Sequence, residues 1–390
     1  MRVKAAVLQR IGAPAPYAES RPLAIAEVEL EPPGAGEVLV RIAAAGLCHS
    51  DLSVINGDRP RPLPMVLGHE AAGVVEEVGP GVGGLAAGDH VVLVFVPSCG
   101  QCLPCRTGRP ALCEPGAVAN GAGTLLSSAR RLRLDGAPVH HHVGVSAFAE
   151  RAVVSSNSVI RIDPGLPFEE AARFGCAVLT GVGAVVNTAR VEAGASVAVV
   201  GLGGVGLNAL LAAQLVGARE VVALDLHEDK LMLARQLGAS QAFRAGEPDC
   251  AEQVRAATGG GVDFAFEMAG SVKAMDLAYR VTRRGGTTVS AGLSHPEHDF
   301  ALKHVGLVAE ERTIKGSYIG SCVPARDIPR FVALYRQGRL PVDRLMSERI
   351  GFEELNAAFD RLAGGHTVRQ LLLPGGSSST RSTNAPARPV

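Results

Sequence analysis

The residues with the clearest chemistry in this 390-residue chain are cysteines, because four of the eight fall between positions 99 and 113. Their spacing is Cys99-x2-Cys102-x2-Cys105-x7-Cys113. Four thiolates so close together can complete a tetrahedron around zinc with no open position, which is typical of a structural site. The loop 97–115 is rich in proline and glycine, and a metal would hold its shape. Because the N-terminus has no apolar leader, metal binding is favoured over disulfides.

A second candidate metal group is dispersed along the chain. Cys48, His69 and Cys176 would supply three ligands and leave one position open for a substrate, as catalytic zinc requires. Taken singly, a buried cysteine or histidine belongs more often to a core than to a metal. These residues therefore need further support, which a family resemblance provides below.

A glycine-rich turn predicts a dinucleotide site. Gly201-x-Gly203-x-x-Gly206 lies between an apolar run of strand length, 196–200, and an apolar helical pattern, 207–216. Such glycines allow a tight turn, close approach of a pyrophosphate and packing of the helix on the strand. The phosphates would then lie at the N-terminus of the helix.

Asp225 completes this motif, because it stands nineteen residues after Gly206, at the end of the next expected strand. A carboxylate there accepts hydrogen bonds from a ribose and repels a 2′-phosphate, so NAD is favoured over NADP. Arg219 and Lys230 lie close by in the sequence and weaken that preference. The cofactor-binding residues predicted here are Gly201, Gly203, Gly204, Val205, Gly206, Asp225 and Lys230.

The pattern of expected secondary structure changes near residue 181. Before it, short strand-like runs such as 37–42 and 73–78 are separated by glycine and proline. After it, strands and helices alternate, which implies a parallel sheet covered by helices on both faces. We expect strands at 196–200, 220–224, 262–266, 286–291 and 312–316, and helices at 207–216 and 228–237. The stretch 375–390 is rich in Ser, Thr, Pro and Ala and is predicted to be a disordered tail.

Composition narrows the function classes. The 38 basic and 38 acidic side chains balance, so neither a nucleic acid nor a membrane partner is expected. The uncharged stretch 193–218 has the glycine-rich turn in its middle, so it reads as a buried strand, turn and helix rather than a membrane span. We expect a cytoplasmic protein. The tract His140-His141-His142 is expected to lie mostly at the surface.

Five motifs occur in the order found in one enzyme family: Cys48-His49-Ser50-Asp51, Gly68-His69-Glu70, the four-cysteine loop, Gly175-Cys176, and Gly201 to Gly206. Over about residues 1–374 the chain resembles the zinc-dependent alcohol dehydrogenases of the medium-chain dehydrogenase/reductase superfamily. The resemblance implies an α/β fold, with a Rossmann-type doubly wound parallel sheet and a β-rich GroES-like catalytic domain. It places the catalytic domain at 1–178 and 320–374, and the NAD-binding domain at 179–319.

By the same resemblance, each chain binds NAD and two zinc ions. Cys48, His69 and Cys176 would hold the catalytic zinc, with Glu70 close behind as a transient ligand, and Cys99, Cys102, Cys105 and Cys113 would hold the structural one. Ser50 would take the proton of the substrate alcohol while zinc polarises its oxygen and the nicotinamide accepts hydride. His49 and Arg369 match positions that contact coenzyme phosphates, and Phe95 matches a wall of the substrate pocket.

The chain also departs from relatives. A histidine often follows the relay serine by three residues, but Ser53 stands here, which leaves water as the expected final proton acceptor. The chain is nearest the branch that contains glutathione-dependent formaldehyde dehydrogenase, yet Ala117 replaces an arginine of that branch, and loop 57–64 lacks its acidic pair. We therefore expect a primary alcohol, with allylic and aromatic alcohols included, and its aldehyde as substrates. A thiol-adduct formaldehyde dehydrogenase and a non-catalytic dinucleotide-binding protein are the alternatives. A homodimer is expected, with a homotetramer as the second choice.

Overall fold

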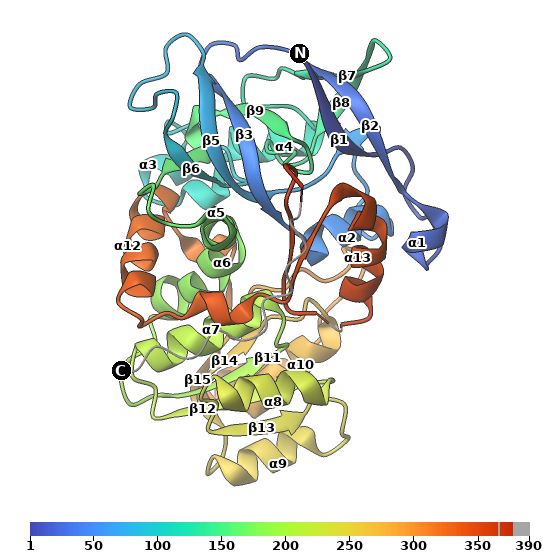
Figure 1. Ribbon diagram of the computed structural model, residues 1–390. Helices are drawn as coiled ribbons and strands as arrows, with labels where there is room; N and C mark the ends of the chain where they lie inside the picture. Colours follow the sequence, from blue (N-terminus) through green and yellow to red (C-terminus); the bar gives the residue numbers. More distant parts are fainter. Residues whose placement is uncertain (366, 377–390) are drawn as a thin grey trace.

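The structure is a computed structural model that describes residues 1–365 and 367–376. The tail predicted at 375–390 lies, from residue 377 onward, outside the described residues. Two lobes are visible: a β-rich lobe at the top of Figure 1 and a lobe built on a parallel sheet below it.

The β-rich lobe contains a small closed barrel and a larger, mostly antiparallel sheet. The barrel strands, in spatial order, are β1 (Arg2–Leu8), β2 (Leu23–Leu30), β7 (Leu132–Leu134), β8 (Ala137–His141) and β4 (Met65–Val66). The larger sheet has the order β10 (Val159–Arg161), β6 (His90–Leu93), β5 (Glu70–Val78), β3 (Glu37–Gly46), β18 (Gln370–Leu372) and β17 (Glu348–Ile350), with β9 (Arg151–Ser155) paired to β3. Strands from both ends of the described chain therefore share one sheet.

The other lobe is a six-stranded parallel sheet. Its spatial order is β13 (Gln241–Arg244), β12 (Glu220–Asp225), β11 (Ser196–Val200), β14 (Val262–Glu267), β15 (Thr282–Ser290) and β16 (Thr313–Gly316). This is the 3-2-1-4-5-6 order of a Rossmann fold, in which ligands bind where the order reverses, beside the first strand. The predicted fold class, a doubly wound parallel sheet with a GroES-like domain, is confirmed.

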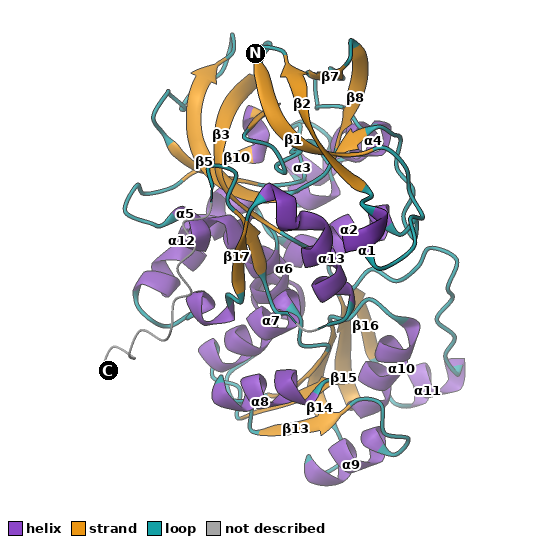
Figure 2. Ribbon diagram, turned by 45° about the vertical axis from the view of Figure 1, so that its right-hand side comes forward, coloured by secondary structure: helices purple, strands orange, loops and turns teal. Residues whose placement is uncertain are grey.

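Helices cover both lobes (Figure 2). Those of the parallel-sheet lobe are α7 (Gly204–Leu215), α8 (Glu228–Gln236), α9 (Cys250–Ala257), α10 (Val272–Val281) and α11 (His304–Ala309). The remaining helices are α1 (Tyr17–Ser20), α2 (His49–Ile55), α3 (Leu103–Arg106), α4 (Glu114–Ala122), α5 (Phe168–Ala171), α6 (Ala177–Gly183), α12 (Pro324–Arg336) and α13 (Leu355–Ala363). Helix α7 begins three residues earlier than predicted, since Gly203 already acts as its N-cap.

The buried helix α6 joins the two lobes. All seven of its residues are buried, and Cys176 stands at its N-cap. A Cβ on Gly181 would collide with the carbonyl oxygen of Val205, so this glycine lets α6 pack directly on the start of α7. Because α7 begins at the glycine-rich turn, this contact fixes Cys176 relative to that turn.

The apolar helices of the described residues are short or bent. No single helix among them is both long enough and apolar enough to cross a bilayer. The segments Phe168–Gly175 and Ala177–Ala189 reach that length and character only as a pair, and they are bent by 54° relative to one another.

Candidate metal centres and dinucleotide site

Three distant segments bring the dispersed metal group together. Cys48 caps helix α2 just after β3, His69 precedes β5, and Cys176 caps α6. The ligand atoms of these residues lie within 4.8 Å of one another. Pairing of β3 with β5 fixes the first two, and the packing of α6 between the lobes brings in the third. The structure therefore brings the predicted Cys2His residues together.

His69 is oriented so that one ring nitrogen is left free. Its Nδ1 lies 3.1 Å from Oδ1 of Asp51, whereas the buried Nε2 has no hydrogen-bond partner in the structure. Metal-binding histidines commonly use one nitrogen for the metal and donate the other N–H to a carboxylate. Two thiols beside an unpartnered imidazole nitrogen form a donor set that suits zinc. A zinc ion thus fits the residues present.

The electrostatics of this group favour anionic sulfur. A hydrogen bond from the Cys176 thiol, together with the charge of His69, lowers the pKa of the Cys48 thiol. Thiolate, not thiol, is the form that binds metal. Cys48 is therefore favoured as a thiolate, whereas the same hydrogen bond, together with burial, raises the pKa of the Cys176 thiol.

Asp51 fixes the orientation of His69 and the backbone around Cys48 through hydrogen bonds. Its carboxylate accepts hydrogen bonds from the backbone N–H of Gly68 at 3.1 Å and of Cys48 at 3.2 Å, besides its contact with His69. Burial alone would raise the pKa of Asp51, but His69 and His142 hold it well below its ordinary value. An ionised Asp51 fixes His69 with Nδ1 as the donor.

His142 shows that the predicted position of the histidine tract was wrong. His141 and His142 are buried, with 1% and 3% of their surface exposed, and His140 is half-buried. His142 Nδ1 lies 3.2 Å from Asp51 Oδ1, and its ring meets His69 edge-on at 5.6 Å. The strand-like pattern is confirmed, since β8 ends at His141, but β8 closes the barrel, and His141 and His142 are buried there. Three adjacent histidines are unusual in a barrel strand, and this pattern in the sequence could have indicated that one of them contacts the Cys48 group.

Glu70 and Arg369 form a buried ion pair next to the Cys48 group. Arg369 Nη2 lies 3.1 Å from Glu70 Oε2, and Arg369 Nη1 donates to the carbonyl of Leu47 at 2.9 Å. Burial raises the pKa of Glu70 to about 7, although the charge of Arg369 opposes the rise. The second carboxylate oxygen, Oε1, is buried without a partner. Glu70 therefore has one oxygen held by Arg369 and one free.

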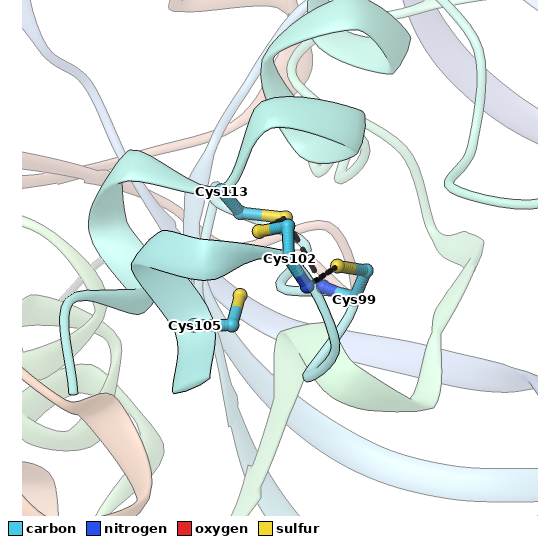
Figure 3. A group of neighbouring side chains, drawn as sticks. All are labelled: Cys99, Cys102, Cys105 and Cys113. Atoms are coloured by element: carbon cyan, nitrogen blue, oxygen red, sulfur yellow. Dashed lines mark hydrogen bonds between the residues drawn. The ribbon is translucent and has the colours of Figure 1, made fainter. Parts of the chain in front are cut away.

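The four cysteines of the second cluster surround a common centre (Figure 3). Their sulfur atoms lie within 4.8 Å of one another, and none forms a disulfide. Backbone N–H groups already point at the sulfurs: Cys99 N lies 3.2 Å from Cys113 Sγ, and Cys102 N lies 3.3 Å from Cys99 Sγ. Backbone hydrogen bonds from Gln101 and Cys102 lower the pKa of the Cys99 thiol to about 6. Closely grouped, hydrogen-bonded sulfurs in a short loop suit a structural zinc ion.

The glycine-rich turn has the form that a pyrophosphate requires. Gly201 directly follows β11 and has a φ of +92°, a conformation that only glycine adopts readily. A Cβ on Gly206 would collide with the carbonyl oxygen of Gly201, so helix and strand are in close contact there. Gly203, in contrast, has no atom within 4 Å of where its Cβ would be. Space is thus left open at the N-terminus of α7.

Asp225 lies at the end of β12 with its carboxylate held by the backbone. It accepts hydrogen bonds from Leu202 N at 2.7 Å and from His227 N at 3.0 Å. Only 7% of its surface is exposed, but that part faces the same cavity as the glycine turn. Lys230, on α8, also lines this cavity.

One cavity of about 690 Å³ connects the Cys48 group with the glycine turn. Cys48, Cys176, His49, Ser50, Phe95, Arg369, Asp225, Lys230 and the residues 200–205 all border it. Phe95 stands between two rings, edge-on to His69 at 5.2 Å and to Tyr318 at 6.2 Å. Ser53 does not face the cavity, because its hydroxyl donates to the carbonyl of His49 at 2.8 Å.

Sequence reasoning did not identify several residues that border the cavity near Cys48. These are Arg59, Thr180, Leu293, Tyr318 and Ile319. They come from a loop, a helix and the segments after β15 and β16, and no spacing rule links them. Loop 57–64 lacks the acidic pair of related enzymes, but it carries Arg59, which no motif in the sequence marks as a site residue.

Two protein-family models match the chain: the alcohol dehydrogenase GroES-like domain over residues 34–164, and the zinc-binding dehydrogenase over residues 204–337. Among solved structures, a zinc-binding-domain alcohol dehydrogenase protein from Burkholderia ambifaria is 38% identical, with a TM-score of 0.89 over 96% of this chain and 99% of that one. A benzyl alcohol dehydrogenase from Acinetobacter calcoaceticus is 33% identical, with a TM-score of 0.89 over 96% and 99%. A protein from Sinorhizobium meliloti 1021, solved bound to NADP, is 27% identical, with a TM-score of 0.77 over 96% and 100%.

The parallel-sheet lobe with its glycine turn, joined to a GroES-like lobe with two groups of metal-binding residues, defines a dinucleotide-dependent dehydrogenase. The chain belongs to the zinc-type alcohol dehydrogenase family of the medium-chain dehydrogenase/reductase superfamily. It is therefore an oxidoreductase of that type, as the sequence resemblance implied.

Proposed function

We propose that this protein interconverts a primary alcohol and its aldehyde with NAD as coenzyme, and that it binds two zinc ions per chain. The observation that carries the proposal is the shared cavity: the Cys48, His69 and Cys176 group opens onto the same space as the glycine turn. A substrate oxygen and a nicotinamide could both be held there. The proposed structural zinc ligands are Cys99, Cys102, Cys105 and Cys113.

Different residues would bind the metal, orient its ligands and accept the proton of the alcohol. A zinc ion held by Cys48, His69 and Cys176 would supply Lewis-acid polarisation of the substrate oxygen. Asp51 keeps His69 in the orientation that leaves Nε2 free. Ser50, which borders the cavity, would accept the proton of the alcohol. Because the hydroxyl of Ser53 is bound to the backbone, we propose that the proton continues to water.

The coenzyme would lie along the cavity from Asp225 to Phe95. Its pyrophosphate would approach Gly203, Gly204 and Val205, with His49 as a nearby hydrogen-bonding partner and Arg369 as a nearby cation. The only acidic side chain that borders this cavity in the described part of the chain is Asp225, which supports NAD over NADP by repelling a 2′-phosphate. Phe95 would form a wall of the substrate pocket. The benzyl alcohol dehydrogenase relative supports aromatic alcohols as part of the substrate range.

A homodimer is proposed as the assembly. Strand β16 is the edge of the parallel sheet, and its four residues are all exposed. An edge strand with unpaired N–H and C=O groups is a ready template for pairing with another copy.

The test combines metal analysis with coenzyme reduction. Purified protein should contain two zinc ions and reduce NAD with primary alcohols, followed by absorbance. Cys48→Ser and Cys176→Ser should each lose one zinc and nearly all NAD reduction, because a Cys2His site with one thiolate removed no longer holds the metal firmly. Cys250→Ser is the control, since this buried cysteine lies outside both metal groups.

If either ligand variant kept both zinc ions and its activity, the assignment would be wrong. Formaldehyde with and without glutathione is included in the panel. Turnover that depends on the thiol would favour the thiol-adduct alternative, and zinc binding without any turnover would favour the non-catalytic one.

A further inference from the structure

Arg59 brings a positive charge to the part of the cavity nearest Cys48. It lies in the loop after α2, where its backbone N–H donates to the carbonyl of Ser53 at 2.8 Å. Its Nη2 reaches across to the other lobe and donates to the carbonyl of Leu293 at 2.7 Å. The charges of four groups act on its guanidinium: Cys48, Arg61, Asp58 and Tyr318. The arginine therefore lies at the substrate end of the cavity.

This guanidinium has no carboxylate partner. In residues 1–365 and 367–376, no Asp or Glu oxygen lies within 4.0 Å of its nitrogens. Its neighbour Asp58 is engaged elsewhere, since Asn56 Nδ2 donates to Asp58 Oδ2 at 2.7 Å. The Nε of Arg59 is buried and makes no hydrogen bond. Burying a charged group without an opposite charge costs free energy. A ligand that brings a negative charge into the cavity would therefore stabilise this guanidinium.

The other Asp, Lys and Arg residues that border the cavity are Arg369, Lys230, Lys273 and Asp225. Arg369 is paired with Glu70, and Lys230 lies close enough to His49 to act on its charge. Asp225, the one carboxylate bordering the cavity among the described residues, is at the end of β12 beside the glycine turn. None of the carboxylates that border the cavity thus pairs with Arg59, although the charge of Asp58 acts on it from outside the cavity lining. A substrate placed between Cys48 and Tyr318 would lie near a guanidinium that has no carboxylate partner.

We infer that Arg59 binds an anionic group of the substrate, so that the preferred substrate is an alcohol or aldehyde carrying a carboxylate away from the reacting carbon. This inference deepens the proposed function and rests on it. The two terminal nitrogens of the guanidinium, Nη1 and Nη2, form a planar fork that binds a carboxylate through two parallel hydrogen bonds, and Nη2 has a second N–H besides the one it donates to Leu293. The apolar rings of Phe95 and Tyr318 would cover the part of the substrate between its two ends.

The test uses substrates matched in shape and different in charge. We would compare 4-(hydroxymethyl)benzoate, benzyl alcohol and 4-(aminomethyl)benzyl alcohol with the zinc-loaded enzyme and NAD. The carboxylate should be preferred over benzyl alcohol by at least about tenfold in kcat/KM, since a hydrogen bond to a charged group contributes about 1.5–3 kcal/mol. The amine should be the poorest substrate. The preference should shrink as salt is added.

Variants test whether the preference for the carboxylate comes from Arg59 or from another residue of the loop. Arg59→Leu should lose the preference for the carboxylate and retain turnover of benzyl alcohol, and Arg59→Lys should restore only part of the preference, since lysine lacks the planar fork. Arg61→Leu is the matched control, because Arg61 is in the same loop and does not border the cavity. It should keep the wild-type preference.

Other outcomes would overturn the inference or the proposed function separately. Equal turnover of the carboxylate and benzyl alcohol would contradict the role of Arg59 and leave the dehydrogenase proposal intact. An Arg59→Leu enzyme that instead bound NAD more weakly, with its substrate preference unchanged, would assign Arg59 to the coenzyme.

Calorimetric titration of 4-(hydroxymethyl)benzoate and benzyl alcohol into the zinc-loaded protein without dinucleotide adds a readout that needs no turnover. Tighter binding of the carboxylate by the wild type, lost in Arg59→Leu, would support the inference even if neither compound were oxidised. A failure to oxidise either compound would contradict the proposed function and leave the inference about Arg59 standing. Equal binding of the two would contradict the inference.

Discussion

His69 uses its two ring nitrogens for different purposes, and this division depends on Asp51. The carboxylate receives the imidazole Nδ1 and two backbone N–H groups, which leaves Nε2 facing Cys48 and Cys176. Because Asp51 is buried and stays ionised, it can hold the ring without competing for the metal. His142 adds a further polar neighbour on the same oxygen. The donor set is thus prepared by hydrogen bonds around it, before an ion is bound.

Asp225 offers a residue-scale test of coenzyme choice. Asp225→Asn removes the charge but keeps an oxygen that can accept a backbone N–H, so it separates repulsion of a 2′-phosphate from the support that Asp225 gives to Leu202 and His227. We expect the KM for NAD to rise by about tenfold and the discrimination against NADP to fall by a similar factor. Initial rates with both coenzymes measure this.

Asp225→Glu is the matched control that keeps the charge, and it should still favour NAD. An Asn variant with unchanged preference would remove Asp225 from coenzyme selection.

At the scale of elements, the junction of β11 and α7 joins the coenzyme turn to the core. Every residue of β11 is buried, and the first turn of α7 lies against α6 through Gly181. Since α6 begins directly after Cys176, one packed unit carries both the glycine turn and a proposed metal ligand. Small shifts at this junction would therefore change the distance between coenzyme and substrate.

Two glycines of the turn should respond differently to the same change. Gly206→Ala forces a methyl group against the Gly201 carbonyl and should destabilise the fold by at least about 3 kcal/mol, at the upper end of overpacking effects. Gly203→Ala meets open space at an ordinary φ of −73°, so its stability should change little. Its methyl group would occupy the proposed pyrophosphate space and weaken coenzyme binding by at least about tenfold.

Thermal melts and NADH titrations of the two variants measure the contrast. If Gly203→Ala bound NADH as tightly as the wild type, the pyrophosphate would not lie at this turn.

At the scale of the whole molecule, the cavity lies where the two lobes meet. Its walls come from the β-rich lobe through Cys48 and Phe95 and from the parallel-sheet lobe through the turn after β11. The contact from Arg59 to Leu293 spans the same junction. One edge of the parallel sheet is the exposed strand β16, and the preceding helix α11 exposes Val305 and Val308. The lobes thus enclose the site, and the free sheet edge is available for assembly.

The assembly prediction is tested at this edge. Ile314→Lys places a charge on β16, where 36% of the isoleucine is exposed, and should weaken self-association by at least about tenfold if this strand pairs with a second copy. Size-exclusion chromatography with light scattering across a range of protein concentrations measures the mass. Met232→Lys is the control, because this exposed residue lies on α8 rather than on β16.

A wild-type protein that is monomeric at all concentrations would contradict the proposed homodimer. A variant that dimerises as the wild type does would show that another surface is used.

The sequence by itself determined the parts of this protein that depend on local chemistry. The four-cysteine loop and the turn from Gly201 to Gly206 are short-range patterns, because zinc needs closely spaced thiolates and a pyrophosphate needs a glycine turn before a helix. The alternation of strands and helices after residue 181 likewise predicted a parallel sheet. Assigning Cys48, His69 and Cys176 to one group required a family resemblance, since nothing local joins residues so far apart.

Only the tertiary structure decided which side chains meet. It buried His141 and His142, because β8 closes the barrel, and it brought His142 to Asp51. It also placed Arg59 at the cavity without a carboxylate partner, a charge environment set by segments more than two hundred positions apart. Burial and the pairing of charges depend on all the elements packed around a residue. Spacing along the chain therefore predicts ligands and turns, whereas the identity of the substrate depends on contacts that form only when the lobes are folded together.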